Sequence, residues 1–90
     1  MLHARKDYNE RIVDLDTVHG IPGNEPVFLL RAQDKHAPLV VEIYALLVNS
    51  DPEGNDCIHR NSIMHAKQMR EWQNQHGKKA PDMIPEDSVY

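Results

Sequence analysis

The fold depends on one stretch, NEPVFLLRAQDKHAPLVVEIYALLVNS (residues 24–50), in which apolar residues are concentrated on either side of a polar RAQDKH group. We expect a helix over residues 35–48. Asp34 is a favourable N-cap residue, and Pro38 falls in the first turn, where its missing N–H has no acceptor within the helix. The helix is expected to end at the turn sequence NSDPEGND, residues 49–56.

A second helix is expected over residues 56–77, because Gly77 is a good residue to end it and Lys78 and Lys79 follow near the negative end of the helix dipole. Helical spacing places one set of mostly apolar side chains on a single side, which predicts a core face. That set is Ile58, Ser62, His65, Ala66, Met69, Trp72 and His76. The two helices and the short turn between them predict an antiparallel helical hairpin.

The segment before the hairpin permits two interpretations. Residues 27–33 (VFLLRAQ) suit a buried strand by their start and a helix by their end, and short apolar runs are not settled by periodicity. Residues 10–18 alternate in polarity, and the Gly- and Pro-rich loop at residues 20–26 would let a strand at 27–33 pair back on residues 11–15. We therefore expect an α+β fold, a short β-ribbon or a small N-terminal helix followed by the hairpin. An all-α fold is the alternative.

Ninety residues predict one small domain, which we place at residues 1–79. Pro81 and Pro85 fall in residues 80–90, which we expect to form an extended, flexible C-terminal arm. The single cysteine, Cys57, excludes a disulfide within the chain and suits a reducing compartment. The polar start MLHARKDYNE is unlike a signal peptide, and no apolar run reaches membrane-spanning length, so we expect a cytoplasmic protein. The net charge of −4 disfavours nucleic acid as a partner.

The first predicted helix is apolar on every side. One face carries Ala37, Val40, Val41, Tyr44 and Val48, and the opposite face carries Leu39, Ile43 and Leu46, with Leu47 on the flank. A helix apolar all round must be buried all round, and one partner helix is too little to cover it. We therefore predict a homo-oligomer whose interface contains Leu39, Ile43, Leu46 and Leu47. In the alternative interpretation, the C-terminal arm folds back over this helix as a lid through Met83, Ile84, Val89 and Tyr90.

The sequence contains no catalytic, metal or nucleotide-binding motif, so we predict a protein that is not an enzyme and needs no cofactor. Cys57 and His59 are two residues apart, which points them to different sides of a helix. His59 and His65 are also separated by a spacing that structural zinc sites do not use. The glycine spacing in GIPGNEP does not match a phosphate-binding loop.

The best candidate for a binding site is the RAQDKH group. Arg31, Lys35 and His36 lie at the expected start of a helix, where the dipole and free N–H groups favour anions. We predict that these three residues hold an anionic small molecule, which we expect to be a nucleotide with Tyr8 stacked on its base. In the competing interpretation, Asp34 caps the helix and occupies the same N–H groups. Tyr44 is expected in the core.

At these residues the chain resembles short uncharacterised proteins of bacteriophages and prophage-bearing bacteria. The resemblance rests on EPVFLLRAQDKHAP, the apolar helix that follows and MREWQ, and covers residues 25–72. It implies a small phage accessory protein in the bacterial cytoplasm. Such proteins sequester a nucleotide defence signal or inhibit a host protein by direct contact. We expect the first activity, with a protein inhibitor or adaptor that docks on a host protein, or a small virion assembly component, as the alternatives.

Overall fold

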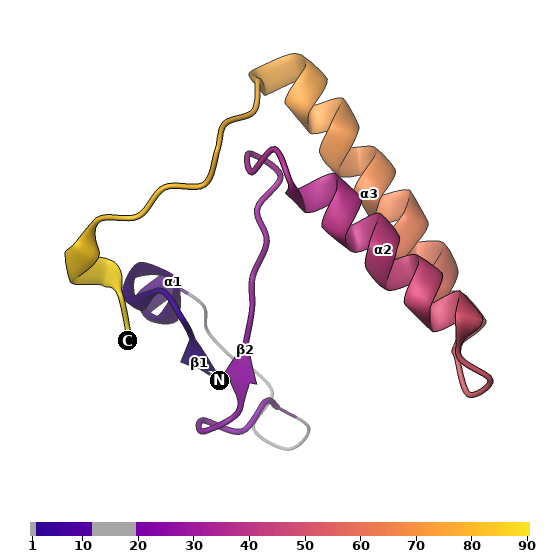
Figure 1. The fold of residues 1–90 in the computed structure, drawn as a ribbon, viewed down its shortest axis with the longest axis horizontal. Helices are drawn as coiled ribbons and strands as arrows, with labels where there is room; N and C mark the ends of the chain where they lie inside the picture. Colours follow the sequence, from indigo (N-terminus) through magenta and orange to yellow (C-terminus); the bar gives the residue numbers. More distant parts are fainter. Residues whose placement is uncertain (1, 12–19) are drawn as a thin grey trace. The chain divides into compact units, whose positions relative to one another are not determined.

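The computed structural model describes residues 2–11 and 20–90 of the chain. Their elements, in order, are β1 (Leu2–His3), α1 (Lys6–Arg11), β2 (Pro26–Val27), α2 (Ala37–Ser50), α3 (Asp56–His76) and the 3₁₀ turn η1 (Pro85–Asp87) (Figure 1). The chain divides into two compact units. The hairpin unit is Leu30–Pro81, and the terminal unit combines Met1–Leu29 with Asp82–Tyr90. Each unit is described by itself.

The hairpin unit consists of α2 and α3, which pack along each other, so the predicted helical hairpin is confirmed (Figure 1). Ala37, Ala45, Ala66 and Met69 are buried, and Ala45 and Ala66 line the same groove where the two helices meet. Small side chains allow two helix backbones to approach closely, because close-packed interiors leave no room for larger side chains without displacement. A narrow line of buried side chains between α2 and α3, rather than a wide core, therefore stabilises the hairpin.

The boundaries of α3 agree with the prediction to within a residue, because its ends carry strong local signals. The Asn55 side chain accepts a hydrogen bond from the Ile58 N–H at 3.0 Å, which satisfies a donor of the first turn. Asp56 lies in that turn, where the helix dipole favours an acid. At the other end Gly77 has a positive φ of 88° and donates its N–H to the Gln73 carbonyl.

The start of α2 differs from the prediction. The helix begins at Ala37 with His36 at the N-cap, so Asp34 is not the N-cap residue. Instead the Asp34 carboxylate accepts a hydrogen bond from the His36 N–H at 2.8 Å, and its carbonyl accepts one from Ala37. The two residues after Asp34 stay out of the helix because the Lys35 N–H donates to the Lys79 carbonyl, an interaction between segments that the local sequence does not encode.

The segment before α2 also differs from the expected ribbon. Of residues 27–33, only Val27 is in a strand, and it pairs in parallel with His3 rather than with the expected residues 11–15. The residues after Val27 form neither the expected strand nor a helix, and Gln33 lies in a turn. Of the strand expected at 10–18, the first two residues belong to α1 and the others lie outside the described residues. The alternative of a small N-terminal helix is realised as α1, and the described fold is dominated by helices.

The terminal unit is organised around Arg5. Its guanidinium makes two hydrogen bonds to the Asp7 carboxylate, at 2.8 and 3.1 Å, lies 4.2 Å from the centre of the Tyr8 ring and donates to the Asp82 carbonyl. The Val89 N–H donates to the Ala4 carbonyl. These contacts join Asp82–Tyr90 to the N-terminal segment. The division of the chain at residue 79 stays a prediction.

Candidate interaction surface

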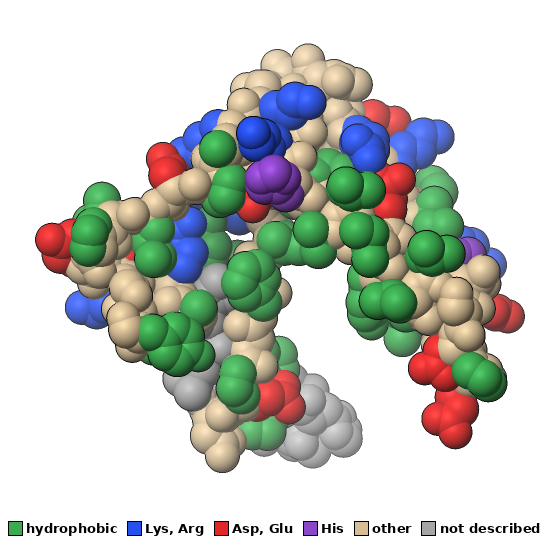
Figure 2. Space-filling model, viewed as in Figure 1, with side chains coloured by type: hydrophobic (Ala, Val, Ile, Leu, Met, Phe, Trp, Pro, Cys, Tyr) green, Lys and Arg blue, Asp and Glu red, His purple; other side chains and the backbone are tan. Residues whose placement is uncertain are grey.

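The largest exposed apolar feature of the hairpin unit is the side of α2 that faces away from α3. Six of its side chains are 44–63% exposed, and we call this set the open face. In Figure 2 hydrophobic side chains gather over α2. Fully burying a side chain of this kind stabilises by about 1.5–3 kcal/mol, so the open face leaves much favourable burial unused. The open face consists of Leu39, Val40, Ile43, Tyr44, Leu46 and Leu47.

The open face is wide because α3 covers only one side of α2. The buried residues of α2 are Ala37, Pro38 and Ala45, and Val41 and Val48 are half-buried. The four predicted interface residues Leu39, Ile43, Leu46 and Leu47 all lie outside this contact. The expectation that Tyr44 belongs to the core is wrong. Its side chain is 51% exposed, although it is only 100° from the buried Ala45 around the helix.

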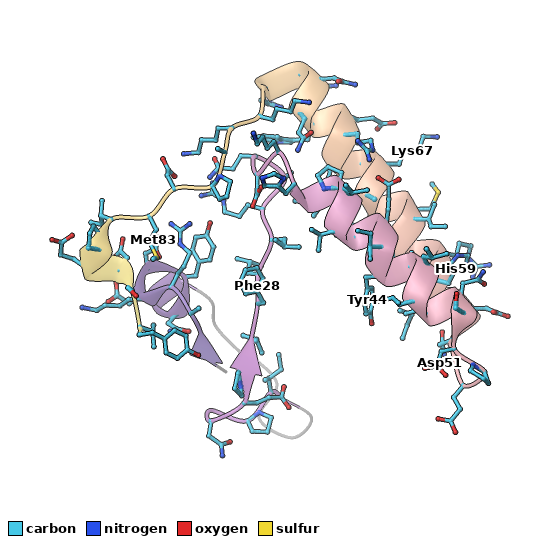
Figure 3. The ribbon with its side chains drawn as sticks, viewed as in Figure 1. Phe28, Tyr44, Asp51, His59, Lys67 and Met83 are labelled. Carbon is cyan, nitrogen blue, oxygen red and sulfur yellow. The ribbon has the colours of Figure 1, made fainter. Side chains whose placement is uncertain are left out.

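A groove of about 440 Å³ lies beside the open face, where the flanks of α2 and α3 meet. Its floor is apolar and its rim carries polar and charged side chains, of which His59 and Lys67 are labelled in Figure 3. Leu46 belongs to both the open face and the groove, so the apolar surface continues from α2 onto α3. The lining residues are Glu42, Ala45, Leu46, His59, Ile63, Ala66, Lys67 and Arg70.

One ion pair crosses the groove rim and links the two helices there. The Arg70 guanidinium on α3 is paired with the Glu42 carboxylate on α2. Both side chains are about half exposed, so the pair adds at most about 1 kcal/mol to stability. Its carboxylate partner reduces the positive charge that Arg70 offers to a ligand.

Charge is unevenly distributed along the hairpin. The turn that joins α2 to α3 contains two acids, Asp51 and Glu53, and no base, and Asp56 follows in the first turn of α3; we call Asp51, Glu53 and Asp56 the acidic end. The opposite end carries Arg31, Lys35, Lys78 and Lys79, which we call the basic end; Asp34 is the one acid among these segments. Figure 2 shows acidic side chains at the turn and Lys and Arg toward the other end of the helices.

Three of the four predicted ligand residues lie at the basic end. Arg31, Lys35 and His36 are exposed, and backbone hydrogen bonds of Gln33 and Lys35 with Lys79 hold their segment against the residues that follow α3. The Gln73 side-chain amide strengthens this junction by donating to the carbonyls of Ala32 and Asp34, at 2.8 and 3.0 Å. The structure thus brings two basic segments together at one end of the hairpin.

The backbone donors at the start of α2 are largely occupied. The N–H groups of His36 and Ala37 donate to Asp34, and Pro38 has none. An anion at this end would therefore be held by side chains rather than by the helix N-terminus. The fourth predicted residue, Tyr8, belongs to the terminal unit, where it is buried beneath the Arg5 guanidinium.

Sequence reasoning missed the hydrogen bonds from the Gln73 side chain to the Ala32 and Asp34 carbonyls, the groove, and the exposure of Val40 and Tyr44. Gln73 sits one residue after Trp72 in a helix, and no local pattern distinguishes it from Gln75, which points elsewhere and is exposed. The groove depends on which residue of α2 lies opposite each residue of α3. Periodicity identifies a face but does not supply this register.

Within residues 2–11 and 20–90, no three His, Cys, Asp or Glu side chains are grouped so that they could hold a metal ion. In the same residues, no helix combines the length and the apolar composition needed to cross a membrane. Cys57 is exposed near the start of α3, with its sulfur 3.7 Å from the Arg60 guanidinium.

Comparison with protein-family models, with curated proteins and with solved structures finds no match to this chain. The resemblance to bacteriophage proteins therefore stays a prediction.

Proposed function

We propose that the chain is a non-enzymatic interaction protein that associates with itself through the open face of α2. The observation that supports this most is the exposure of six contiguous apolar side chains on a helix that is otherwise packed. Covering their exposed parts is worth roughly 5 kcal/mol in total, comparable with the stability of a whole small domain. A patch of this kind on a small protein marks an interaction site or an aggregation liability.

The test measures the mass of the purified protein across a range of concentrations, by native mass spectrometry and sedimentation. Wild type is expected to exceed the 10.4 kDa of a single chain, and the mass should fall on dilution. A variant with Ile43→Glu and Leu47→Glu places two charges on the open face and should remain a single chain. Met64→Glu is the matched control, because Met64 is equally exposed but lies on α3 away from α2.

Two results would contradict the proposal. One is a wild-type protein that stays at the mass of one chain up to several hundred micromolar. The other is an equal loss of association in the Met64→Glu control, which would indicate general destabilisation. Far-ultraviolet circular dichroism on all three proteins verifies that the helices remain.

A second candidate function is binding of an anionic small molecule at the basic end. The observation that favours it is the backbone hydrogen bond from the Lys35 N–H to the Lys79 carbonyl, which brings the two basic segments together. Arg31, Lys35 and Lys78 then supply cations from two segments. Titration calorimetry with a panel of nucleotides tests the idea. Replacing Arg31 and Lys35 by alanine should abolish binding, whereas replacing Arg60 and Lys67, which lie on α3, should leave it unchanged. If no nucleotide binds the wild type, this candidate is rejected.

Docking on a host protein is the third proposal, and it uses either the open face or the C-terminal segment. Truncation after Lys79 separates these two surfaces, because it removes the arm and leaves α2 and α3 in place. Loss of capture of a host protein on truncation supports the arm. Loss in the Ile43→Glu, Leu47→Glu variant supports the open face.

A further inference from the structure

Most of the charged side chains that flank α2 have the signs that its helix dipole disfavours. A helix is stabilised by acids near its N-terminus and bases near its C-terminus, each by about 0.3–1 kcal/mol. The first turn of α2 contains no acid and its last turn no base. Lys35 lies before the start, where a base is unfavourable, next to Asp34, whose carboxylate accepts the His36 N–H; Asp51 and Glu53 lie after the end, where acids are unfavourable. The partial negative charge at the end of α2 therefore has the same sign as Asp51 and Glu53, and the partial positive charge at its start has the same sign as Lys35.

The neighbouring helix offsets the dipole of α2 because it is antiparallel, so the charge at each end of the hairpin is that of the side chains. α3 runs in the opposite direction and follows the usual rule, with Asp56 in its first turn and His76 in its last turn. Its first turn lies beside the end of α2, so a third acid joins Asp51 and Glu53. The carboxylate of Asp34, the acid at the basic end, accepts the His36 N–H. The hairpin unit is thus negative at one end and positive at the other.

From this arrangement we infer that the occupant of the open face is a second copy of the chain with its α2 antiparallel to the first. The inference rests on the proposed self-association and adds the orientation of the partner. In the antiparallel arrangement the acidic end of each copy lies beside the basic end of the other. The same apolar side chains meet across a two-fold axis near the middle of α2, at Ile43 and Tyr44.

The parallel arrangement covers the same apolar residues but brings like charges together. Asp51, Glu53 and Asp56 of one copy would then face the same three acids of the other, and the basic ends would also meet. Like-charge contacts across an interface are unfavourable, whereas opposite charges select one partner orientation. The open face by itself does not distinguish the two arrangements, and the charges at its ends do.

The test places one cysteine at either end of α2 in the full chain. Both variants carry Cys57→Ser, which removes the chain's single cysteine. One adds Ser50→Cys at the end of α2 and the other His36→Cys before its start; both positions are exposed. The two proteins are mixed, equilibrated and treated with a short flexible bis-maleimide, and mass spectrometry measures the linked pairs.

The antiparallel arrangement brings position 36 of one copy near position 50 of the other, so mixed pairs should exceed both kinds of like pair at least tenfold. In α2 the two positions are separated by about 21 Å at 1.5 Å per residue, beyond the reach of the linker for like pairs. A majority of like pairs, equal amounts of all pairs, or no linked pairs in a protein that does self-associate would overturn the inference. A protein that stays a single chain would overturn the proposed function instead.

Charge reversal supplies an independent measurement. A variant with Asp51→Lys and Glu53→Lys should self-associate at least tenfold more weakly at low salt, and so should one with Arg31→Glu and Lys35→Glu. Mixing the two variants should restore association, because each reversed end then meets a complementary one. Unchanged self-association of the separate variants is the result expected from a parallel pair, and it contradicts the inference.

Discussion

The two long helices of the hairpin differ in how much their own end residues stabilise them. α3 has a capping side chain at Asn55, an acid in its first turn, a base in its last turn and a glycine at its end. α2 has no side-chain cap hydrogen bond and no favourable charge in either terminal turn, and it is apolar on nearly every side. The local sequence therefore stabilises α3, whereas α2 depends on packing. The difference indicates that α3 suits an exposed position and that α2 suits a buried one.

The largest expected effect on stability comes from truncating a buried side chain between the helices. Met69→Ala removes a buried side chain from the face of α3 that contacts α2, and it should lower the free energy of unfolding by about 2–4 kcal/mol. Met64→Ala is the control, since Met64 lies on the same helix but is half exposed, and it should change stability by less than about 0.5 kcal/mol. Urea denaturation followed by Trp72 fluorescence measures both at one protein concentration. Equal effects at the two positions would remove the distinction between the faces of α3.

The turn between the two helices is tightly packed at Gly54. A β-carbon there would lie 1.9 Å from the Val48 carbonyl oxygen and 2.9 Å from that of Asp51, so the backbone must shift to accept it. Gly54→Ala should therefore destabilise the hairpin by about 1–3 kcal/mol, the usual range for overpacking. Gly23→Ala is the control, because no atom lies within 4 Å of a β-carbon at that position. Thermal unfolding compares the two variants, and equal melting temperatures would contradict the prediction.

The helix starts provide the most direct comparison of α2 with α3. Asn55→Ala removes the hydrogen bond to the Ile58 N–H and should reduce stability by about 1 kcal/mol. His36→Ala should have almost no effect on stability, because the His36 side chain makes no capping bond at the start of α2. Chemical denaturation of both variants measures the difference. A larger loss at His36 than at Asn55 would show that α2, rather than α3, is the locally stabilised helix.

Acid should affect the terminal unit while the hairpin serves as the internal reference. Hydrogen bonds from Arg5 lower the pKa of the Asp7 carboxyl. The charged form is favoured in the folded state, so its contribution to stability is present above the unfolded pKa of about 3.9 and is lost as the pH falls through the lower, folded pKa. Amide signals of Ala4, Tyr8 and Asp82 should change below about pH 4. Asp7→Asn should remove the transition, and its persistence would assign it to another group.

The hairpin was predictable because its signals are local. The boundaries of α3 follow from Asn55, Asp56 and Gly77, which act on backbone groups within one turn. The start of α2 was misplaced because Asp34, a good N-cap residue by type, is used in a turn that the Lys35–Lys79 hydrogen bond imposes. In the candidate site, too, local features were predictable and contacts between distant segments were not. The exposed residues Leu39, Ile43, Leu46 and Leu47 follow from periodicity, whereas the groove beside them does not.

The sequence by itself determined that a helix follows the RAQDKH group and has more apolar surface than one neighbour covers, because side-chain type and helical period are local properties; its bounds, predicted at 35–48, are 37–50 in the structure. It also determined that acids cluster at one end of that helix and bases at the other. Only the tertiary structure decided which side of α2 contacts α3, and hence that Val40 and Tyr44 join the open face. That choice accompanies the burial of Ala45 on α2 and Ala66 on α3, which line the same groove where the two helices meet and whose small side chains leave room for close packing.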